Sequence, residues 1–208
     1  MIEHYENAIQ IAALAVCATV AIYKAIICSS RSWTMLALFY GSWLLGDIYW
    51  LLCLVFYGDT PQISVVADLS WFASFLFLYL LLRHTSPPEE LGPFGVFPWF
   101  GPVFSVGMAV FFMLRGEILS NLVYAGLMGL LLFTSIRRLV AHKVKSRLLS
   151  TVVFIFCLLE YALWIASCFW NDDATFQVYY LFDILLTACF PFFLPATEKA
   201  VAEKAVAA

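Results

Sequence analysis

The chain has 208 residues, of which 64% are hydrophobic and only 12% are charged, with a net charge of −3. A soluble globular domain carries about 25% charged residues and roughly 45–50% apolar ones. The mean hydropathy of +0.93 therefore excludes an ordinary soluble domain. The scarcity of charge also excludes a disordered chain and a nucleic-acid-binding protein with a basic field. We expect an all-α integral membrane protein that contacts membrane lipids and binds no nucleic acid.

Seven apolar runs are long enough to cross a bilayer, which takes about 20 residues per helix. Charged or turn-forming residues separate these runs, so we expect a single seven-helix membrane domain over residues 1–208. A short low-complexity tail over residues 196–208, expected to be a frayed helix, is assigned no function. The predicted spans are residues 8–28, 34–57, 62–83, 95–114, 118–136, 148–170 and 175–195.

Basic residues gather on one side of this predicted bundle. With seven spans, the loops after the first, third and fifth helices share a side with the C-terminus. Ten of the eleven Lys and Arg residues lie on that side, and Arg115 lies on the other. Because cytoplasmic loops carry the excess of positive charge, we expect the N-terminus outside and the C-terminus in the cytoplasm of a bacterial plasma membrane.

The two halves of the sequence resemble each other. A shift of 113 residues places Asp47 on Glu160, and a shift of 115 residues places Asp68 on Asp183. Carboxylates are scarce here, so their agreement carries more weight than matches between apolar residues; the alternative is coincidence. The pattern predicts two parallel three-helix repeats with a linker helix between them, an architecture whose binding sites lie at the repeat interface. The repeats would cover residues 8–84 and 118–195, and the linker helix residues 95–114.

Four carboxylates fall inside the predicted spans: Asp47, Asp68, Glu160 and Asp183. A charged side chain at the bilayer centre costs at least about 2.5–3.5 kcal/mol on insertion scales, so such groups usually face the bundle interior and mark a function. No Lys or Arg lies at matching depth in the sequence, so a buried salt bridge does not explain them. We expect at least two of the four to line one shared polar site. The structural alternative is hydrogen bonding between helices by protonated acids.

Aromatic residues accompany each carboxylate at helical spacings of three, four or seven residues, which place side chains on one helix face. Indole and phenol groups can donate hydrogen bonds to a carboxylate while their rings close the pocket. These aromatic residues are Trp43 and Trp50 for Asp47, Trp71 for Asp68, Trp164 for Glu160 and Tyr179 for Asp183.

The sequence predicts neither a metal site nor another cofactor. The six cysteines lie in predicted spans without a Cys-x-x-Cys pair, which is typical of buried thiols that act as small hydrophobic groups. The three histidines, His4, His84 and His142, lie outside the apolar runs, so triad and zinc chemistry inside the membrane are not expected.

Residues 44–48 (Leu-Leu-Gly-Asp-Ile) and 179–186 (Tyr-Tyr-Leu-Phe-Asp-Ile-Leu-Leu) resemble helices of the YhhN-type family, whose members include lysoplasmalogenases. In that family a Gly-Asp pair lies in an apolar helix, and a later helix reads Tyr-Tyr-x-x-Gln-Leu-Leu. Asp68, Glu160 and Asp183 stand where the family carries His, Asp and Gln.

The resemblance implies hydrolysis of the vinyl ether of a lysoplasmalogen, which needs a proton delivered to carbon and a directed water molecule. Two carboxylates can divide these roles without a metal. Asp47 would be one catalytic partner, and Glu160 or Asp183 the other. The expected substrate-binding residues are Asp68, Trp43, Trp50, Trp71, Trp164, Tyr179 and Tyr180.

Two other functions remain open from the sequence. One is a proton- or cation-coupled transporter of small molecules, because the two-repeat architecture resembles SWEET and PQ-loop proteins and the carboxylates could hold a proton, a cation or a small cationic substrate. The other is a membrane protein that senses a lipid or ligand without turnover. The oligomeric state is not predicted.

Overall fold

The computed structural model describes residues 2–58, 65–85, 95–115, 118–141, 147–169 and 177–207, and every regular element within these ranges is a helix. Six helical segments are long and apolar enough to cross a membrane. The predicted starts of two spans, at residues 62 and 175, lie outside the described residues. The helices are α1 (Ile2–Cys28), α2 (Arg31–Tyr57), α3 (Val65–Thr85), α4 (Phe100–Met113), α5 (Ile118–Val140), α6 (Arg147–Ser167), α7 (Val178–Cys189) and α8 (Phe193–Ala207).

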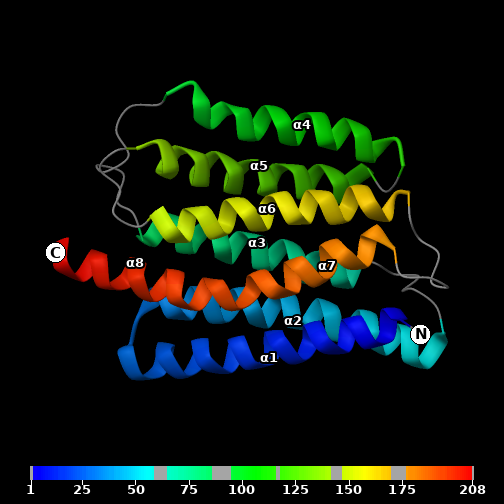
Figure 1. Cartoon of the computed structure of the whole chain (residues 1–208), viewed down its shortest axis with the longest axis horizontal. Helices are drawn as coiled ribbons and strands as arrows, with labels where there is room; N and C mark the ends of the chain where they lie inside the picture. Colours follow the sequence, from blue (N-terminus) through cyan, green and yellow to red (C-terminus); the bar gives the residue numbers. More distant parts are fainter. Residues whose placement is uncertain are drawn as a thin grey trace.

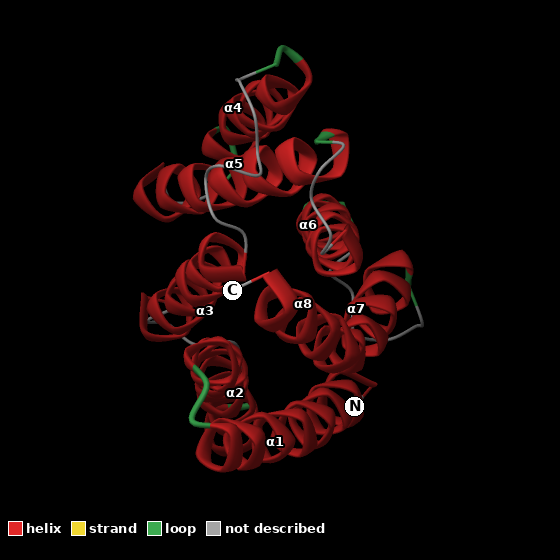
Figure 2. Cartoon of the chain, turned by 90° about the vertical axis from the view of Figure 1, so that its left-hand side faces the viewer, coloured by secondary structure: helices red, strands yellow, loops and turns green. Residues whose placement is uncertain are grey.

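The long helices form a ring in which α1, α2, α3, α5, α6 and α7 are neighbours in turn, and α7 closes the ring against α1. Figure 2 shows α4 outside this ring, on the far side of α5. Close packing holds α4 there, because Gly101 lies so near α5 that a Cβ atom would come within 2.7 Å of the Leu132 Cβ. The predicted linker helix is therefore a peripheral one, and with its 3-10 turn it extends over Phe97–Met113.

From α1 to α7, successive helices run in opposite directions, and the two termini lie at opposite ends of the bundle (Figure 1). The last two helices, α7 and α8, continue one another across a 3-10 turn at Phe190–Phe192 that contains Pro191. The tail expected to fray is part of α8, where Thr197 and Ala200 are buried.

The continuous segment formed by α7 and α8 lies at different distances from the bundle axis along its length. At the end near the N-terminus, α7 lies on the ring between α6 and α1. Toward the other end, α8 moves inward and contacts α2, α3 and α6 (Figure 2). Phe193, Ala196 and Ala200 are consequently almost inaccessible. This inward course fills one end of the bundle and leaves space at the other.

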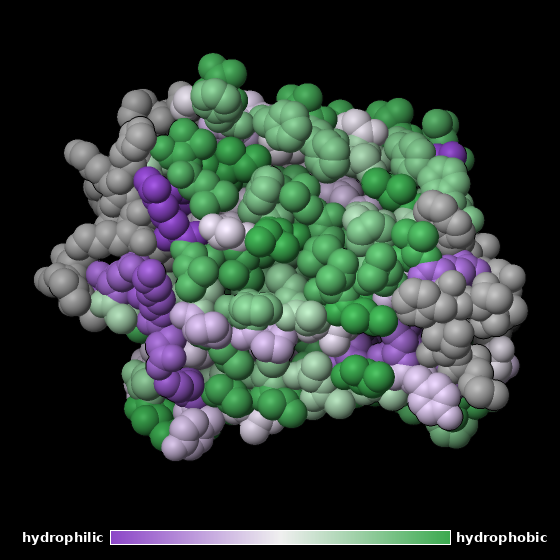
Figure 3. Space-filling model, viewed as in Figure 1, coloured by the Kyte–Doolittle hydropathy of each residue, from purple (hydrophilic) through white to green (hydrophobic). Residues whose placement is uncertain are grey.

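Apolar side chains cover the face of the bundle seen in Figure 3, with hydrophilic residues toward its two ends. Such a surface suits lipid rather than water. Eight of the nine basic residues in the described ranges belong to the end that holds the C-terminus, and the ninth, Arg115, follows α4 at the other end. We call the first of these the basic end.

An aromatic cluster lies between the two ends. We call Phe39, Trp43, Phe75, Phe156 and Phe190 the aromatic floor, since their rings contact one another with centroids 5.2–6.2 Å apart. Tyr40 extends the cluster and donates a hydrogen bond to the carbonyl oxygen of Phe190 at 2.7 Å. The floor separates the basic end from the space near the N-terminus.

Arg138, expected in a cytoplasmic loop, lies in the last turn of α5 and is fully buried. Its guanidinium donates hydrogen bonds to the carbonyl oxygen of Leu82 at 2.8 Å and to Oγ1 of Thr85 at 3.1 Å. A helix end leaves carbonyl groups without intrahelical donors, and Arg138 supplies hydrogen-bond donors to the C-terminal end of α3. It joins α5 to α3 at the basic end.

Replacing Arg138 by Ala should destabilise the protein, because it leaves buried acceptors at the end of α3 without their donor. We expect a loss of about 2–4 kcal/mol in the free energy of unfolding, or roughly 5–10 °C in the Tm of the detergent-solubilised protein. Arg147→Ala is the control, since Arg147 is exposed and, among the described residues, donates to the carbonyl oxygen of Ala141. Equal Tm values for the two variants would contradict this role.

Candidate acidic cavity

A cavity of about 380 Å³ lies inside the ring, in the half of the bundle near the N-terminus. Side chains from α1, α2, α3, α5, α6 and α7 line it, and none of the described residues of α4 does. Trp43 and Phe75 belong both to its lining and to the aromatic floor. The cavity therefore ends at the floor, where α8 begins to fill the bundle.

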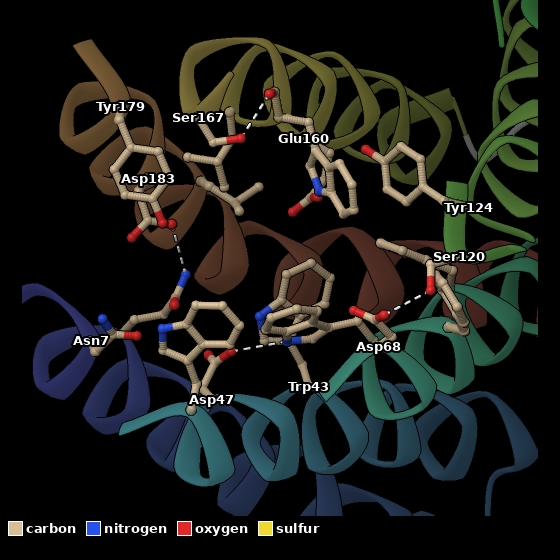
Figure 4. Close-up of a pocket in the computed structure, with 18 of the residues that line it drawn as sticks. Asn7, Trp43, Asp47, Asp68, Ser120, Tyr124, Glu160, Ser167, Tyr179 and Asp183 are labelled. Atoms are coloured by element: carbon tan, nitrogen blue, oxygen red, sulfur yellow. Dashed lines mark hydrogen bonds between the residues drawn. The ribbon is translucent and has the colours of Figure 1, made fainter. Parts of the chain in front are cut away.

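All four carboxylates predicted inside the membrane line this cavity. Asp47 and Asp68 extend from α2 and α3 on one side, and Glu160 and Asp183 from α6 and α7 on the other (Figure 4). Asp47 is ten residues from the end of α2 and Glu160 seven from the end of α6, or roughly 15 Å and 10 Å deep. All four are at least nine-tenths buried.

Asp68 and Asp183 each accept a hydrogen bond from the adjacent helix of the ring, at the two places where the groups α1–α3 and α5–α7 meet (Figure 4). Oγ of Ser120, on α5, donates to Oδ2 of Asp68 at 2.9 Å. Nε2 of Gln10, on α1, donates to Oδ1 of Asp183 at 3.2 Å. Each bond joins one helix of the group α1–α3 to one helix of the group α5–α7.

Asp47 and Glu160 are bonded differently. Nε1 of Trp71 donates to Oδ1 of Asp47 at 3.0 Å, and both residues belong to the same three-helix group. Oδ2 of Asp47 and Oε1 of Glu160 are buried and have no hydrogen-bond partner among the described residues. Buried carboxyl oxygens normally find a donor, so these two atoms are open to a proton, a water molecule or a ligand.

Nine of the ten residues predicted for the site line the cavity, and Tyr180 does not. Tyr179, Asp183 and Leu186 share the lining face of α7, at spacings of four and three residues. Tyr180 lies about 100° around the helix from Tyr179, so its buried ring packs beside that of Tyr179 instead. The nine are Trp43, Asp47, Trp50, Asp68, Trp71, Glu160, Trp164, Tyr179 and Asp183.

Several lining residues were absent from the sequence prediction. Gln10 and Asn121 carried a usable signal, because a side-chain amide inside an apolar run needs a partner in the protein. Ser120 and Ser167 carried none, since serines are common in this chain and in membrane helices generally. The lining residues missed were Asn7, Gln10, Phe72, Phe75, Ser120, Asn121, Tyr124, Leu163, Ser167 and Leu186.

Among the described residues, no group of three or more His, Cys, Asp and Glu side chains is arranged so that it could hold a metal ion. The one ion pair among the described residues joins Lys24 and Glu198 at 2.7 Å. It lies at the basic end and not in the cavity. The cavity can hold protons on its carboxyl groups, bind a positively charged group, or orient a water molecule between two acids.

No known protein family, curated protein or solved structure matches the chain. The resemblance to the YhhN-type family stays a prediction from the segments 44–48 and 179–186.

Gly46 precedes Asp47 and is required by the cavity wall. A Cβ atom at this position would come within 2.7 Å of Nε1 of Trp71, the atom that donates to Asp47. Gly46→Ala should therefore displace the indole and cost about 1–3 kcal/mol in the free energy of unfolding. The fluorescence emission of the tryptophans should shift with it.

Gly41 provides the matched control, because it lies in the same helix and a Cβ atom there meets nothing within 4 Å. Gly41→Ala should leave the Tm unchanged or slightly raised, since Ala favours a helix more than Gly. The cost of Gly46→Ala should fall in a Trp71→Phe background. An unchanged cost in that background would show that the indole is not the reason for the glycine.

Proposed function

We propose that the protein is a membrane transporter that binds a proton, a cation or a small cationic substrate in the acidic cavity between two three-helix groups. The observation that supports this most directly is the position of the carboxylates. Asp68 and Asp183 join the two groups, while Asp47 and Glu160 keep free oxygens between them. Binding sites between repeats, with charged groups near mid-membrane, are typical of secondary transporters.

The hydrogen bonds of the cavity agree with a two-repeat architecture. Asp68 and Asp183 correspond in the alignment of the two halves, and each accepts its bond from the first helix of the opposite group. Asp47 and Glu160 also correspond, and each carries an unpartnered oxygen. This matches the pattern expected for two parallel repeats related by an axis along the membrane normal.

We further propose that the segment Phe97–Met113 is a seventh crossing. Fourteen residues of α-helix and three of 3-10 helix give a length of about 27 Å, close to the roughly 30 Å hydrocarbon core. The segment lies alongside α5 (Figure 1). Its apolar outer residues, including Val103, Val106 and Val110, are exposed and would face lipid.

With seven crossings, the basic end lies in the cytoplasm by the positive-inside rule. The acidic cavity then faces outward, and the aromatic floor closes it from the cytoplasm. A transporter in this conformation would be ready to take up its substrate from outside.

A second candidate is hydrolysis of a lysolipid vinyl ether, favoured by Asp47 and Glu160. Their free oxygens lie on opposite sides of one cavity with apolar walls. Such a pair could divide the roles of acid and base, and the Gly46-Asp47 segment is the part that resembles the YhhN-type family.

Proteoliposomes containing the protein should take up protons, Na⁺ or radiolabelled methylammonium faster than protein-free liposomes under an imposed membrane potential. Pyranine fluorescence follows the protons, and filtration follows the other two. Asp68→Asn and Asp183→Asn should reduce the flux, because both weaken the bonds that join the two groups. Glu198→Gln removes a carboxylate at the basic end and should not.

The hydrolase predicts a different result with the same preparation. Purified protein mixed with lysoplasmalogen in detergent should release a fatty aldehyde, and Asp47→Asn should abolish the release. Aldehyde release without flux would contradict transport. The absence of both would leave binding without turnover, the sensing function, as the better description.

A further inference from the structure

We propose that the acidic cavity binds a primary ammonium compound with a planar apolar body, whose ammonium group lies between Asp47 and Glu160. This proposal names the class of substrate for the proposed transporter. It rests on the proposed function only in calling the bound compound a substrate. The binding itself can be tested apart from transport.

The strongest reason is the pair of buried oxygens without donors. Glu160 is only 2% exposed and Asp47 only 3%, yet within the part of the chain that the structure describes Oε1 of Glu160 and Oδ2 of Asp47 have no hydrogen-bond partner. A buried polar group without a partner costs free energy that a ligand can recover by donating to it. The two residues extend into the cavity from opposite sides (Figure 4).

The other two carboxyl groups each have one oxygen that already accepts a hydrogen bond from the protein. Ser120 donates to Asp68 and Gln10 donates to Asp183, and both bonds hold the wall of the cavity together. One oxygen of each carboxyl group is therefore occupied by a donor from the protein. The cavity therefore has a specific position for a positive charge, and not only an acidic character.

The aromatic lining selects an organic cation. Trp50 and Trp71 pack with ring centroids 5.9 Å apart, and Tyr124 stacks on Trp164 at 4.5 Å, so π faces and edges surround the acids. A cation is attracted to such faces, and a flat apolar group packs against them. A hydrated inorganic ion would gain little from these walls.

The unpartnered oxygens also select the type of ammonium. A primary ammonium group has three N–H donors and can bond both acids with charge-assisted hydrogen bonds. A quaternary ammonium group has none and would leave both oxygens without a donor. The volume of about 380 Å³ is at the lower end of the range of roughly 300–1,000 Å³ for small-molecule sites, which suits a one-ring amine.

The test is isothermal titration calorimetry of the purified full-length protein in detergent with phenethylammonium. Phenethyl alcohol and phenethyltrimethylammonium are the matched compounds, since the first lacks the charge and the second lacks the N–H donors. We expect saturable binding of the primary amine and at least about tenfold weaker binding of the other two. Na⁺ and Ca²⁺ should not compete at equal concentration.

Variants locate the ammonium group. Glu160→Gln and Asp47→Asn keep the shape of the side chain and should each weaken phenethylammonium binding by at least about tenfold. Glu198→Gln, at the basic end, should have no effect. Elution volume and Tm, measured on each variant, verify that it is folded, and Glu160→Asp serves as a second substitution that keeps the charge and should retain part of the affinity.

Equal binding of the alcohol, preferred binding of the quaternary ammonium, competition by Na⁺ or Ca²⁺, or unchanged affinity in folded Glu160→Gln would each overturn the inference. So would the lack of any phenethylammonium binding. These results are distinct from failure of transport. Proton or Na⁺ flux without amine binding contradicts only the ligand class, whereas amine binding without flux contradicts only the transport function.

Discussion

The fold depends on the need of buried carboxylates for hydrogen-bond donors. An acidic group surrounded by apolar helices is costly unless the protein supplies partners. Here the partners come from the adjacent helix of the other three-helix group, because Ser120 on α5 donates to Asp68 on α3 and Gln10 on α1 donates to Asp183 on α7. Two acids thus hold opposite halves of the bundle together, and the space that they enclose is where the other two acids remain available.

The two ends of the bundle are held together by different chemistry. At the cavity end, the links between halves are the hydrogen bonds of Asp68 and Asp183. At the basic end, the links involve cations: Arg138 with the end of α3, Lys204 with the carbonyl oxygen of His84, and Lys24 with Glu198. The links at the cavity end therefore depend on buried carboxyl groups, whereas those at the basic end depend on cationic donors.

The sequence predicted the features that depend on one helix at a time. Composition predicted a membrane protein. The spacing of Trp43, Asp47 and Trp50 predicted that they share one helix face, and all three line the cavity. The features that depend on how helices pack against one another were not predictable. The burial of Arg138 and the donors of Asp68 and Asp183 are set by neighbours more than fifty residues away in the chain. Tyr180, unlike Tyr179, does not line the cavity, because a motif does not report which face of its helix is turned inward.

The continuous segment formed by α7 and α8 contributes to both ends of the bundle, because it turns inward along its length. Its first part carries Asp183 in the cavity wall, and its second part fills the interior at the basic end with Phe193, Ala196 and Ala200. The two parts meet at the 3-10 turn around Pro191, where Tyr40 supplies a donor to the Phe190 carbonyl. Such a turn is a natural pivot, because it interrupts the regular helical ladder. Because α7 and α8 are continuous through this turn, the position of Asp183 in the cavity wall is tied to the packing of Phe193 and Ala196 at the basic end.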